Sequence, residues 1–197
     1  LHSLQHSFPT RRSSDLVRQR ANILAENITK WGNPNTIVTN NCASDFQPLG
    51  PIFDLIICDA PCSGEGMFRK DPQSIDEWST ANVAMCQERQ REILSDIWQC
   101  LKPGGLLIYS TCTYNTLENE ENAVWASEQL GAELISIDIP SEWNISDNKL
   151  SNSNFNVYRF FPHKTQGEGF FACIMRKNSD AEISPTRTPK NKEHKKG

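Results

Sequence analysis

No stretch of this 197-residue sequence approaches the roughly 20 consecutive apolar residues that a membrane-spanning helix requires. The formal net charge is −4, so bulk charge does not suggest a nucleic-acid partner. Such a function would need a local basic patch or another domain. No two cysteines have Cys-x-x-Cys spacing, and we therefore expect no zinc or other metal site. These absences point to an ordinary globular protein without a membrane partner.

Glycine-rich phosphate loops are also missing. Neither GxGxxG nor GxxxxGK[ST] occurs, so either no nucleotide cofactor binds or its loop lies outside this chain. Histidine is scarce, and three of the four lie near the termini: His2, His6 and His194. A cysteine hydrolase needs a histidine base, and the remaining His163 has no recognisable motif around it. The sequence therefore disfavours a cysteine hydrolase.

The seven cysteines are too few and too scattered for a disulfide scaffold, and no signal peptide is recognisable. We therefore expect a reducing, cytoplasmic setting, in which thiols are core fillers or catalytic groups. Those in apolar patterns are expected to pack as small hydrophobic residues: Cys58, Cys86, Cys100 and Cys173. Core packing explains Cys62 poorly, because it follows Pro61 in a glycine-rich segment.

Both ends of the sequence differ from its middle. Residues 1–16 show no helical or strand periodicity, and SFPTRRSSDL at 7–16 resembles a translated sequencing adapter. We therefore exclude this leader from the fold and expect the natural protein to begin upstream of Val17. Residues 178–197 are polar with a Lys-rich close, which predicts a disordered linker or tail. One domain at 17–177 remains, and we expect it to be monomeric.

Hydrophobic periodicity and turn residues predict alternating helices and strands in this domain. Helices are predicted at 17–31, 71–78, 79–101 and 115–131, and strands at 36–39, 53–58, 106–110, 133–137, 157–161 and 170–175. The apolar run FDLIIC at 53–58 predicts a strand buried on both faces. The last two strands have a short link and are expected to be antiparallel. This order is typical of a doubly wound α/β sheet.

Two motifs directly follow predicted strands. DAPCSGEGMFRK at 59–70 follows the strand at 53–58, and TCTYN at 111–115 follows the strand at 106–110. In an open α/β sheet, ligands bind at the edge formed by the carboxyl ends of the strands. The acid Asp59 and the thiols of Cys62 and Cys112 are therefore expected at this edge.

In this order, the two motifs resemble those of the Nop/Sun (RsmB/RsmF-like) family of RNA cytosine carbon-5 methyltransferases, most closely its bacterial RsmF-type ribosomal-RNA enzymes. The resemblance runs from about Val17 to Lys177 and includes KPGG at 102–105 and GFF at 169–171. It implies an α/β fold, the class I S-adenosylmethionine-dependent methyltransferase (Rossmann-like) sheet, with a C-terminal antiparallel strand pair. The family's first two strands and its glycine-rich loop would precede Val17, so the sheet would lack them here.

The resemblance also implies a chemistry and a cofactor, S-adenosylmethionine. A thiolate adds to carbon 6 of cytosine, so that carbon 5 becomes nucleophilic enough to accept a methyl group. Cys112 would be that nucleophile, and Cys62 would be the general base that allows its release. Asp59 would hydrogen-bond the edge of the cytosine ring and, with Pro61, face the cofactor.

Further residues are expected to contact the cofactor or the RNA. Cys42 stands where many relatives carry an aspartate that contacts the adenine, so either Asp45 replaces this contact or the contact is lost. Arg69, Lys70 and Lys164 are expected to hold RNA phosphate, although Arg69 has the alternative of pairing with a surface acid. The acids at the next helix start are interpreted as solvated: Glu118, Glu120 and Glu121.

Two alternative functions stay open. A DNA cytosine carbon-5 methyltransferase uses the thiol after the proline as its nucleophile and lacks a second thiol after threonine, so Thr111-Cys112 favours RNA. A non-catalytic RNA-binding remnant is the other alternative, because the cofactor loop is missing. We accordingly expect this chain alone to bind S-adenosylmethionine negligibly. We also expect it to fold poorly, since the strands at 36–39 and 53–58 lack the partners that separate them in the family.

Overall fold

The computed structural model describes residues 2–5, 11–14, 17–150 and 155–178. The helices are α1 (Arg18–Trp31), α2 (Gln73–Glu77), α3 (Thr80–Cys100) and α4 (Glu120–Leu130), and the 3₁₀ helices are η1 (Ala43–Leu49), η2 (Glu65–Met67) and η3 (Ser141–Trp143). The strands are β1 (His2–Gln5), β2 (Arg11–Ser14), β3 (Thr36–Thr39), β4 (Phe53–Asp59), β5 (Leu101–Thr111), β6 (Ala132–Ile135), β7 (Tyr158–Phe160) and β8 (Phe170–Lys177). In the described part of the chain, no helix combines the length and the apolar character needed to cross a membrane.

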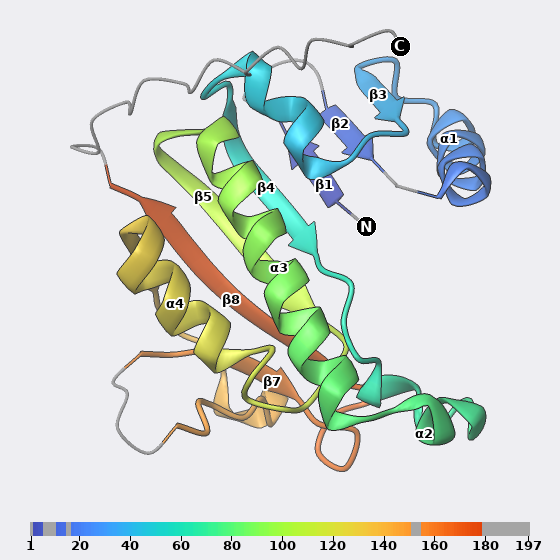
Figure 1. Ribbon diagram of the computed structural model, residues 1–197, viewed down its shortest axis with the longest axis vertical. Coiled ribbons are helices and arrows are strands. Elements are labelled where there is room, and N and C mark those ends of the chain that lie inside the picture. The colour runs from blue at the N-terminus through green and yellow to red at the C-terminus, as the bar shows by residue number, and fades with distance from the viewer. Residues whose placement is uncertain (1, 6–10, 15–16, 151–154, 179–197) are drawn as a thin grey trace, which may run out of the picture.

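These strands form one mixed, 8-stranded sheet of order β3-β2-β1-β4-β5-β8-β6, with β7 also paired to β8 (Figure 1). β4 and β5 are parallel neighbours, whereas β8 runs antiparallel to β5, β6 and β7. The predicted α/β sheet with a final antiparallel pair is therefore confirmed.

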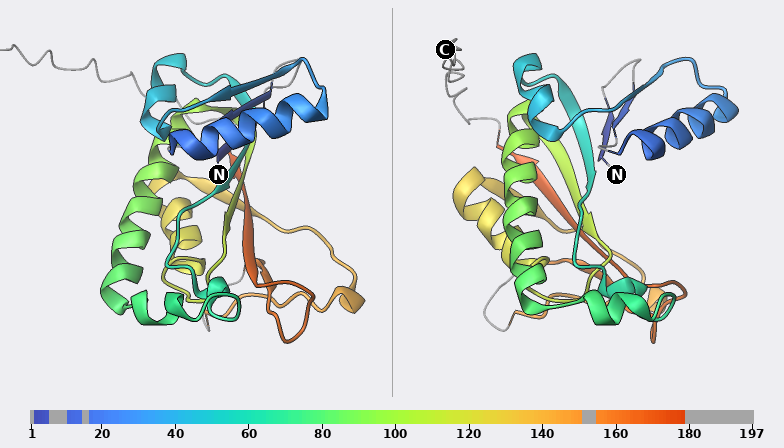
Figure 2. Two further views of the ribbon diagram at one scale, coloured as in Figure 1. Left: turned by 90° about the vertical axis from the view of Figure 1, so that its right-hand side faces the viewer. Right: turned by 45° about the vertical axis from the view of Figure 1, so that its right-hand side comes forward.

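Helices α3 and α4 pack on the same face of the sheet (Figure 2). Ser79 caps the start of α3, because its hydroxyl accepts a hydrogen bond from the backbone N–H of Asn82. Its buried residues Ile93, Leu94 and Ile97 belong to the core that also contains buried side chains of β4, β5 and β8. α2 and the start of α3 lie at the end of the sheet toward which β4 points (Figure 1).

Only one face of the central strands is fully buried. Along β4 and β5, buried Ile56 and Leu107 are followed by half-buried Ile57 and Ile108. The prediction that residues 53–58 are buried on both faces is therefore wrong. α3 and α4 cover one face, whereas α1 lies on the other side, where it contacts β3 (Figure 2).

The leader takes part in the sheet, contrary to the expectation that it forms no strand. β1 pairs antiparallel with β4, and β2 pairs parallel with β3, so the two strands occupy the space between β3 and β4. Unpaired backbone groups along two strand edges favour pairing with an extended segment even where it lacks a hydrophobic pattern. Residues 1, 6–10 and 15–16 of the leader and residues 179–197 of the predicted tail lie outside the described residues.

The register across the sheet brings three strand ends to one edge. Thr39 of β3 aligns with Ser14, Ser14 with His2, and His2 with Cys58 of β4. Cys58 in turn aligns with Tyr109 of β5. The segments that follow β3, β4 and β5 therefore all begin at the same edge of the sheet, which is where the two motifs lie.

Candidate active site

The two motif thiols are adjacent at the carboxyl ends of β4 and β5. Asp59 of β4 lies opposite Ser110 of β5, and the Ala60 N–H donates to the Ser110 carbonyl at 2.9 Å, so the two following segments leave the sheet side by side. The Sγ atoms of Cys62 and Cys112 are 3.1 Å apart, and both residues are half-buried. The expectation that the acid and both thiols share one edge is confirmed by this geometry.

This contact shifts the pKa values of the two thiols in opposite directions. The pKa of Cys112 is lowered to about 7, chiefly because the Cys62 thiol donates a hydrogen bond to its sulfur. The same contact, together with burial, raises the pKa of Cys62. Cys112 is therefore the thiol that ionises near neutral pH, while Cys62 keeps its proton.

Glu65 of the first motif holds the backbone of the second. Its carboxylate is nearly buried and accepts hydrogen bonds from the N–H groups of Tyr114 at 2.6 Å and Asn115 at 2.9 Å. The neighbouring Gly66 N–H donates to the carbonyl of Cys112 at 2.8 Å. A Cβ atom at Gly66 would lie 2.5 Å from that oxygen, so only glycine allows the two backbones to approach this closely.

Glu118, which follows the second motif in the sequence, holds the backbone of the first motif in the same way. It is fully buried and accepts hydrogen bonds from the Ser63 N–H at 3.0 Å, the Ser63 hydroxyl at 2.5 Å and the Asn115 amide at 2.7 Å. Gln90 of α3 donates from Nε2 to Glu118 at 2.7 Å and to the carbonyl of Pro61 at 2.8 Å. Each of the two segments thus supplies one carboxylate, which accepts hydrogen bonds from donors of the other segment. We call Glu65 and Glu118 the carboxylate clamp.

The interpretation of the acids around the start of α4 as solvated is wrong for two of them. Glu118 and Glu120 are fully buried, and Glu121 alone of the three is partly exposed. Glu120 forms a buried ion pair with Arg159 of β7, whose Nη1 also donates to the carbonyl of Tyr114 at 2.8 Å. Buried carboxylates need such partners, and these come from segments distant in the sequence.

The predicted cofactor-binding residues also follow strand ends at this edge. Asp59 and Pro61 are exposed, and the Ser110 hydroxyl donates to the Asp59 carboxylate at 3.3 Å. After β3, the N–H of Cys42 donates to Oδ2 of Asp45 at 3.0 Å, which closes the first turn of η1. Hydrogen bonds from Cys42 and Asn41 lower the pKa of Asp45.

This set of groups fits part of S-adenosylmethionine. Its ribose hydroxyls and amino groups donate hydrogen bonds, and the carboxylates of Asp59 and Asp45 can accept them. Pro61, which lies between Asp59 and Cys62 in the sequence, is exposed and offers an apolar surface. The sequence contains no GxGxxG turn that would complete such a pocket.

The predicted phosphate-binding residues of the first motif lie on exposed loops. Arg69 donates to the carbonyl of Gly167 at 2.8 Å and forms an ion pair with Glu168 at 3.4 Å, while its side chain stays 59% exposed. It therefore does pair with a surface acid, as the alternative interpretation held. Lys70 is exposed beside it in the sequence.

Lys164 and His163 lie together on the loop between β7 and β8. Lys164 is exposed and donates from Nζ to the hydroxyl of Ser146 at 2.9 Å. His163 stacks on Phe161, with ring centroids 5.4 Å apart. Among the described residues, neither side chain hydrogen-bonds to the thiols, so His163 does not lie where it could act as their base.

The remaining cysteines of the strands and of α3 behave largely as predicted. Cys58, Cys100 and Cys173 are fully buried, and burial raises the pKa of each thiol. Cys86 is half-buried, and burial is the main cause of its raised pKa as well. In the described part of the chain, no group of three His, Cys, Asp or Glu side chains gathers as a metal site.

Sequence reasoning missed the polar residues that hold the two motifs together. Gln90 did carry a signal, because it lies on the buried stripe of α3 seven positions after Val83. Arg159 carried another, since it is a charged residue between aromatic residues of a predicted strand. Glu65 stands between two glycines inside the motif, which marks a position where backbones approach closely.

The opposed thiol pKa values lead to a test by alkylation. We expect the iodoacetamide reaction of Cys112 to rise with pH through a midpoint near 7. Replacing Cys62 by alanine removes the hydrogen-bond donor, so the midpoint should rise toward the ordinary thiol value of about 8.5. Peptide-resolved mass spectrometry over a pH series measures both curves, with Cys86→Ala as the matched control. An unchanged midpoint in Cys62→Ala would show that the contact does not set the Cys112 pKa.

A sequence model of the family described as "16S rRNA methyltransferase RsmB/F" matches residues 10–176. The chain is 35% identical over 181 residues to "Ribosomal RNA small subunit methyltransferase F" of Enterobacter sp. (strain 638), which covers 91% of this chain and 37% of the relative. The protein of the same name from Salmonella heidelberg (strain SL476) is 35% identical over 174 residues, covering 88% of this chain and 36% of the relative. The chain thus spans little more than a third of the length of these relatives.

Solved structures with the same fold include NSun6 from Pyrococcus horikoshii with SFG, at a TM-score of 0.70 and 29% identity, covering 84% of this chain and 41% of that chain. A methyltransferase homolog protein from Pyrococcus horikoshii matches with a TM-score of 0.69 and 26% identity, covering 84% of this chain and 52% of that chain. The fold is that of class I S-adenosylmethionine-dependent methyltransferases. The extent of the family match, which agrees closely with the resemblance predicted for 17–177, shows that the chain belongs to the 16S rRNA methyltransferase RsmB/F family.

Proposed function

We propose that this chain carries the catalytic thiols of an enzyme that methylates carbon 5 of cytosine in RNA, with ribosomal RNA as substrate and S-adenosylmethionine as methyl donor. The observation that supports this most is the 3.1 Å contact between Cys62 and Cys112, in which only Cys112 has a lowered pKa. Family membership supports the substrate class and the cofactor.

The reaction begins with Cys112. Its thiolate adds to carbon 6 of the cytosine, and the electron pair of the 5,6 double bond becomes available at carbon 5. Asp59, exposed at the same edge, accepts a hydrogen bond from the cytosine amino group and orients the ring. S-adenosylmethionine, when bound, supplies the electrophilic methyl group that carbon 5 takes up.

Release requires a base, and we assign this role to Cys62 because its pKa depends on the state of Cys112. Its pKa is raised first by its hydrogen bond to Cys112, then by burial and by the charge of the Cys112 thiolate. Once Cys112 is a thioether, both contributions from Cys112 are gone, so Cys62 loses its proton to water more readily. The Cys62 thiolate then removes the proton from carbon 5, the sulfur–carbon 6 bond breaks, and the Cys112 thiolate is regenerated.

Arg69, Lys70 and Lys164 contribute positive charge for RNA phosphates around the site. The target base must leave its stack to reach sulfur atoms at the end of a sheet, as in other base-modifying enzymes. Single-stranded RNA is therefore the substrate form that fits best, since a base in a duplex costs extra energy to extrude.

The function is tested with the complete enzyme, labelled S-adenosylmethionine and 16S ribosomal RNA. We expect methyl incorporation, with 5-methylcytidine as the modified nucleoside found by mass spectrometry after digestion. A DNA strand of the same sequence serves as the matched control. Methylation of the DNA alone, or of another nucleoside, would contradict the proposal. Binding of RNA without any methyl transfer would favour the non-catalytic alternative.

A further inference from the structure

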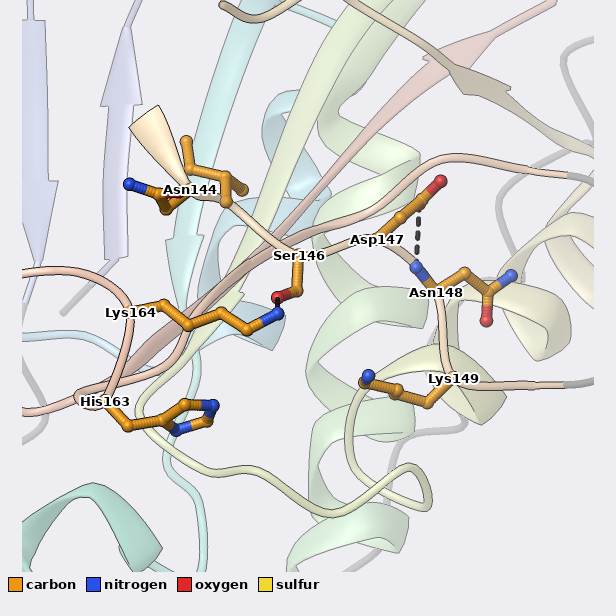
Figure 3. A pocket seen from close by; sticks show the side chains of 8 residues that line it. Asn144, Ser146, Asp147, Asn148, Lys149, His163 and Lys164 are labelled. Carbon is orange, nitrogen blue, oxygen red and sulfur yellow. Dashed lines mark hydrogen bonds between the residues drawn. The ribbon is translucent and has the colours of Figure 1, made fainter. Parts of the chain in front are cut away.

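A hollow of about 600 Å³ lies beside the active-site edge, and of the residues that line it only Lys164 has a role in the function proposed above. Residues 144–149 form one wall, and His163 and Lys164 form the other (Figure 3). The first wall is fixed to β7 by a pair of backbone hydrogen bonds between Ser146 and Arg159, both of 2.9 Å. The hollow is therefore bounded by an anchored segment on one side.

The walls of this hollow carry an excess of positive charge. Lys149 and Lys164 are both exposed, and the Nζ of Lys164 reaches across to the hydroxyl of Ser146 at 2.9 Å (Figure 3). The lining acid, Asp147, accepts hydrogen bonds through one oxygen from the N–H groups of Asn148 at 2.7 Å and Val157 at 3.2 Å. Two ammonium groups in a chain of net charge −4 make this a local site for an anion.

The hollow also contains an aromatic surface. His163 is exposed and stacks on Phe161 at 5.4 Å between centroids, and Phe161 contacts Tyr114 at 5.9 Å. The ammonium of Lys149 lies 5.6 Å from the centroid of Phe161. An aromatic ring backed by a second ring and flanked by cations is the combination that binds a base together with its phosphates.

A buried ion pair connects the hollow to the nucleophile's loop. The backbone N–H of Lys149 donates to Oε1 of Glu120 at 3.1 Å, and Arg159 donates to the same oxygen from Nε at 2.6 Å. Arg159 also holds the carbonyl of Tyr114, which is two residues beyond Cys112. The position of the hollow is therefore coupled to that of the reacting sulfur.

From this geometry, and resting on the proposed function, we propose that the hollow binds one nucleotide of single-stranded RNA that neighbours the target cytosine. The ammonium groups of Lys149 and Lys164 hold the two phosphates that flank this nucleotide, and its base stacks on His163. The site would thus fix the strand beside the target while the target base itself lies at the thiols.

The test measures binding of a single-stranded RNA oligonucleotide containing the target cytosine to the complete enzyme by fluorescence anisotropy over a series of salt concentrations. Because each phosphate contact on a single strand contributes about 0.7 to the salt slope, Lys149→Ala/Lys164→Ala should lower that slope by about 1.4. His163→Ala should weaken binding about tenfold without changing the slope, since a stacking contact carries no charge.

Lys30→Ala provides the matched control, because this exposed lysine lies on α1 and pairs with Glu26 at 2.7 Å. Its slope and affinity should equal those of the wild type. If the wild type binds and methylates RNA while the double variant keeps the full salt slope, the hollow is not the binding site and the proposed function stands. If the wild type neither binds nor methylates RNA, both proposals are overturned.

Discussion

Replacing Cys112 by alanine should lower methyl transfer by the complete enzyme at least about 10⁴-fold, because no other group takes over the addition to carbon 6. Replacing Cys62 by alanine should have a different result. Addition and methyl transfer still occur, but no base removes the carbon-5 proton, so the protein stays attached to the RNA. Denaturing electrophoresis with labelled RNA distinguishes the two variants, since only Cys62→Ala should yield a covalent complex.

Cys86→Ala is the control for this comparison, as it removes a half-buried thiol of α3 that is not hydrogen-bonded to either motif thiol. It should retain methyl transfer and form no stable complex. A covalent complex trapped by Cys112→Ala would reverse the two roles. That reversal would also match the DNA-type assignment, in which the thiol after the proline is the nucleophile.

Removing the carboxylate of Glu118 should be the most destabilising single change at the site. Glu118→Ala would leave the hydroxyl of Ser63, the amide of Gln90 and the amide of Asn115 without their shared buried acceptor. Hydrogen bonds to a charged group are among the stronger ones, so we expect a loss of about 3 kcal/mol in the free energy of unfolding. Urea titration measures this loss.

Two variants make the Glu118 result specific. Glu128→Ala removes an exposed acid of α4 and should change the free energy of unfolding by less than about 0.5 kcal/mol. Glu118→Gln keeps the size of the side chain but turns an amide group toward existing donors, and should shift the alkylation midpoint of Cys112. A Glu118→Ala protein as stable as Glu128→Ala would mean that the carboxylate clamp does not hold the two motifs together.

The arrangement of the thiols could be predicted because it depends on local pattern and on one rule of sheets. Each motif follows an apolar run, and parallel strands that are neighbours end at the same edge. Because Asp59 aligns with Ser110, the segments that follow these two residues begin side by side, and this places Cys62 next to Cys112. The helices could also be predicted from the sequence. Ser79 caps the start of α3, and Gly32, whose backbone adopts the left-handed conformation, ends α1.

The carboxylate clamp could not be predicted in the same way. Acids near the start of a helix ordinarily face water, and nothing near Glu118 reveals that Gln90, on another helix, will donate to it. The same holds for Glu120, whose partner Arg159 is far along the chain. Burial of these acids is a property of the assembled structure, because only packing decides which donors surround them.

Two expectations about the sheet were wrong because they depend on how distant segments pack and pair, which the local sequence does not reveal. Most residues of β4 are apolar, yet Leu55 and Ile57 are only half-buried, because coverage depends on which helices lie against the sheet. The strands β1 and β2 show no alternating hydrophobic pattern, and their pairing follows from the unpaired edges of β3 and β4. Backbone hydrogen bonding can thus place a strand that side-chain periodicity does not predict.

The central claim, that Cys112 forms the bond to cytosine and Cys62 assists its release, is tested most directly with the wild-type complete enzyme and RNA that carries 5-fluorocytidine at the target. A fluorine at carbon 5 cannot leave as a proton does, so the covalent intermediate accumulates without any mutation. Digestion and mass spectrometry then identify the peptide attached to the RNA. We predict attachment at Cys112; attachment at Cys62 would contradict the roles assigned to the two thiols.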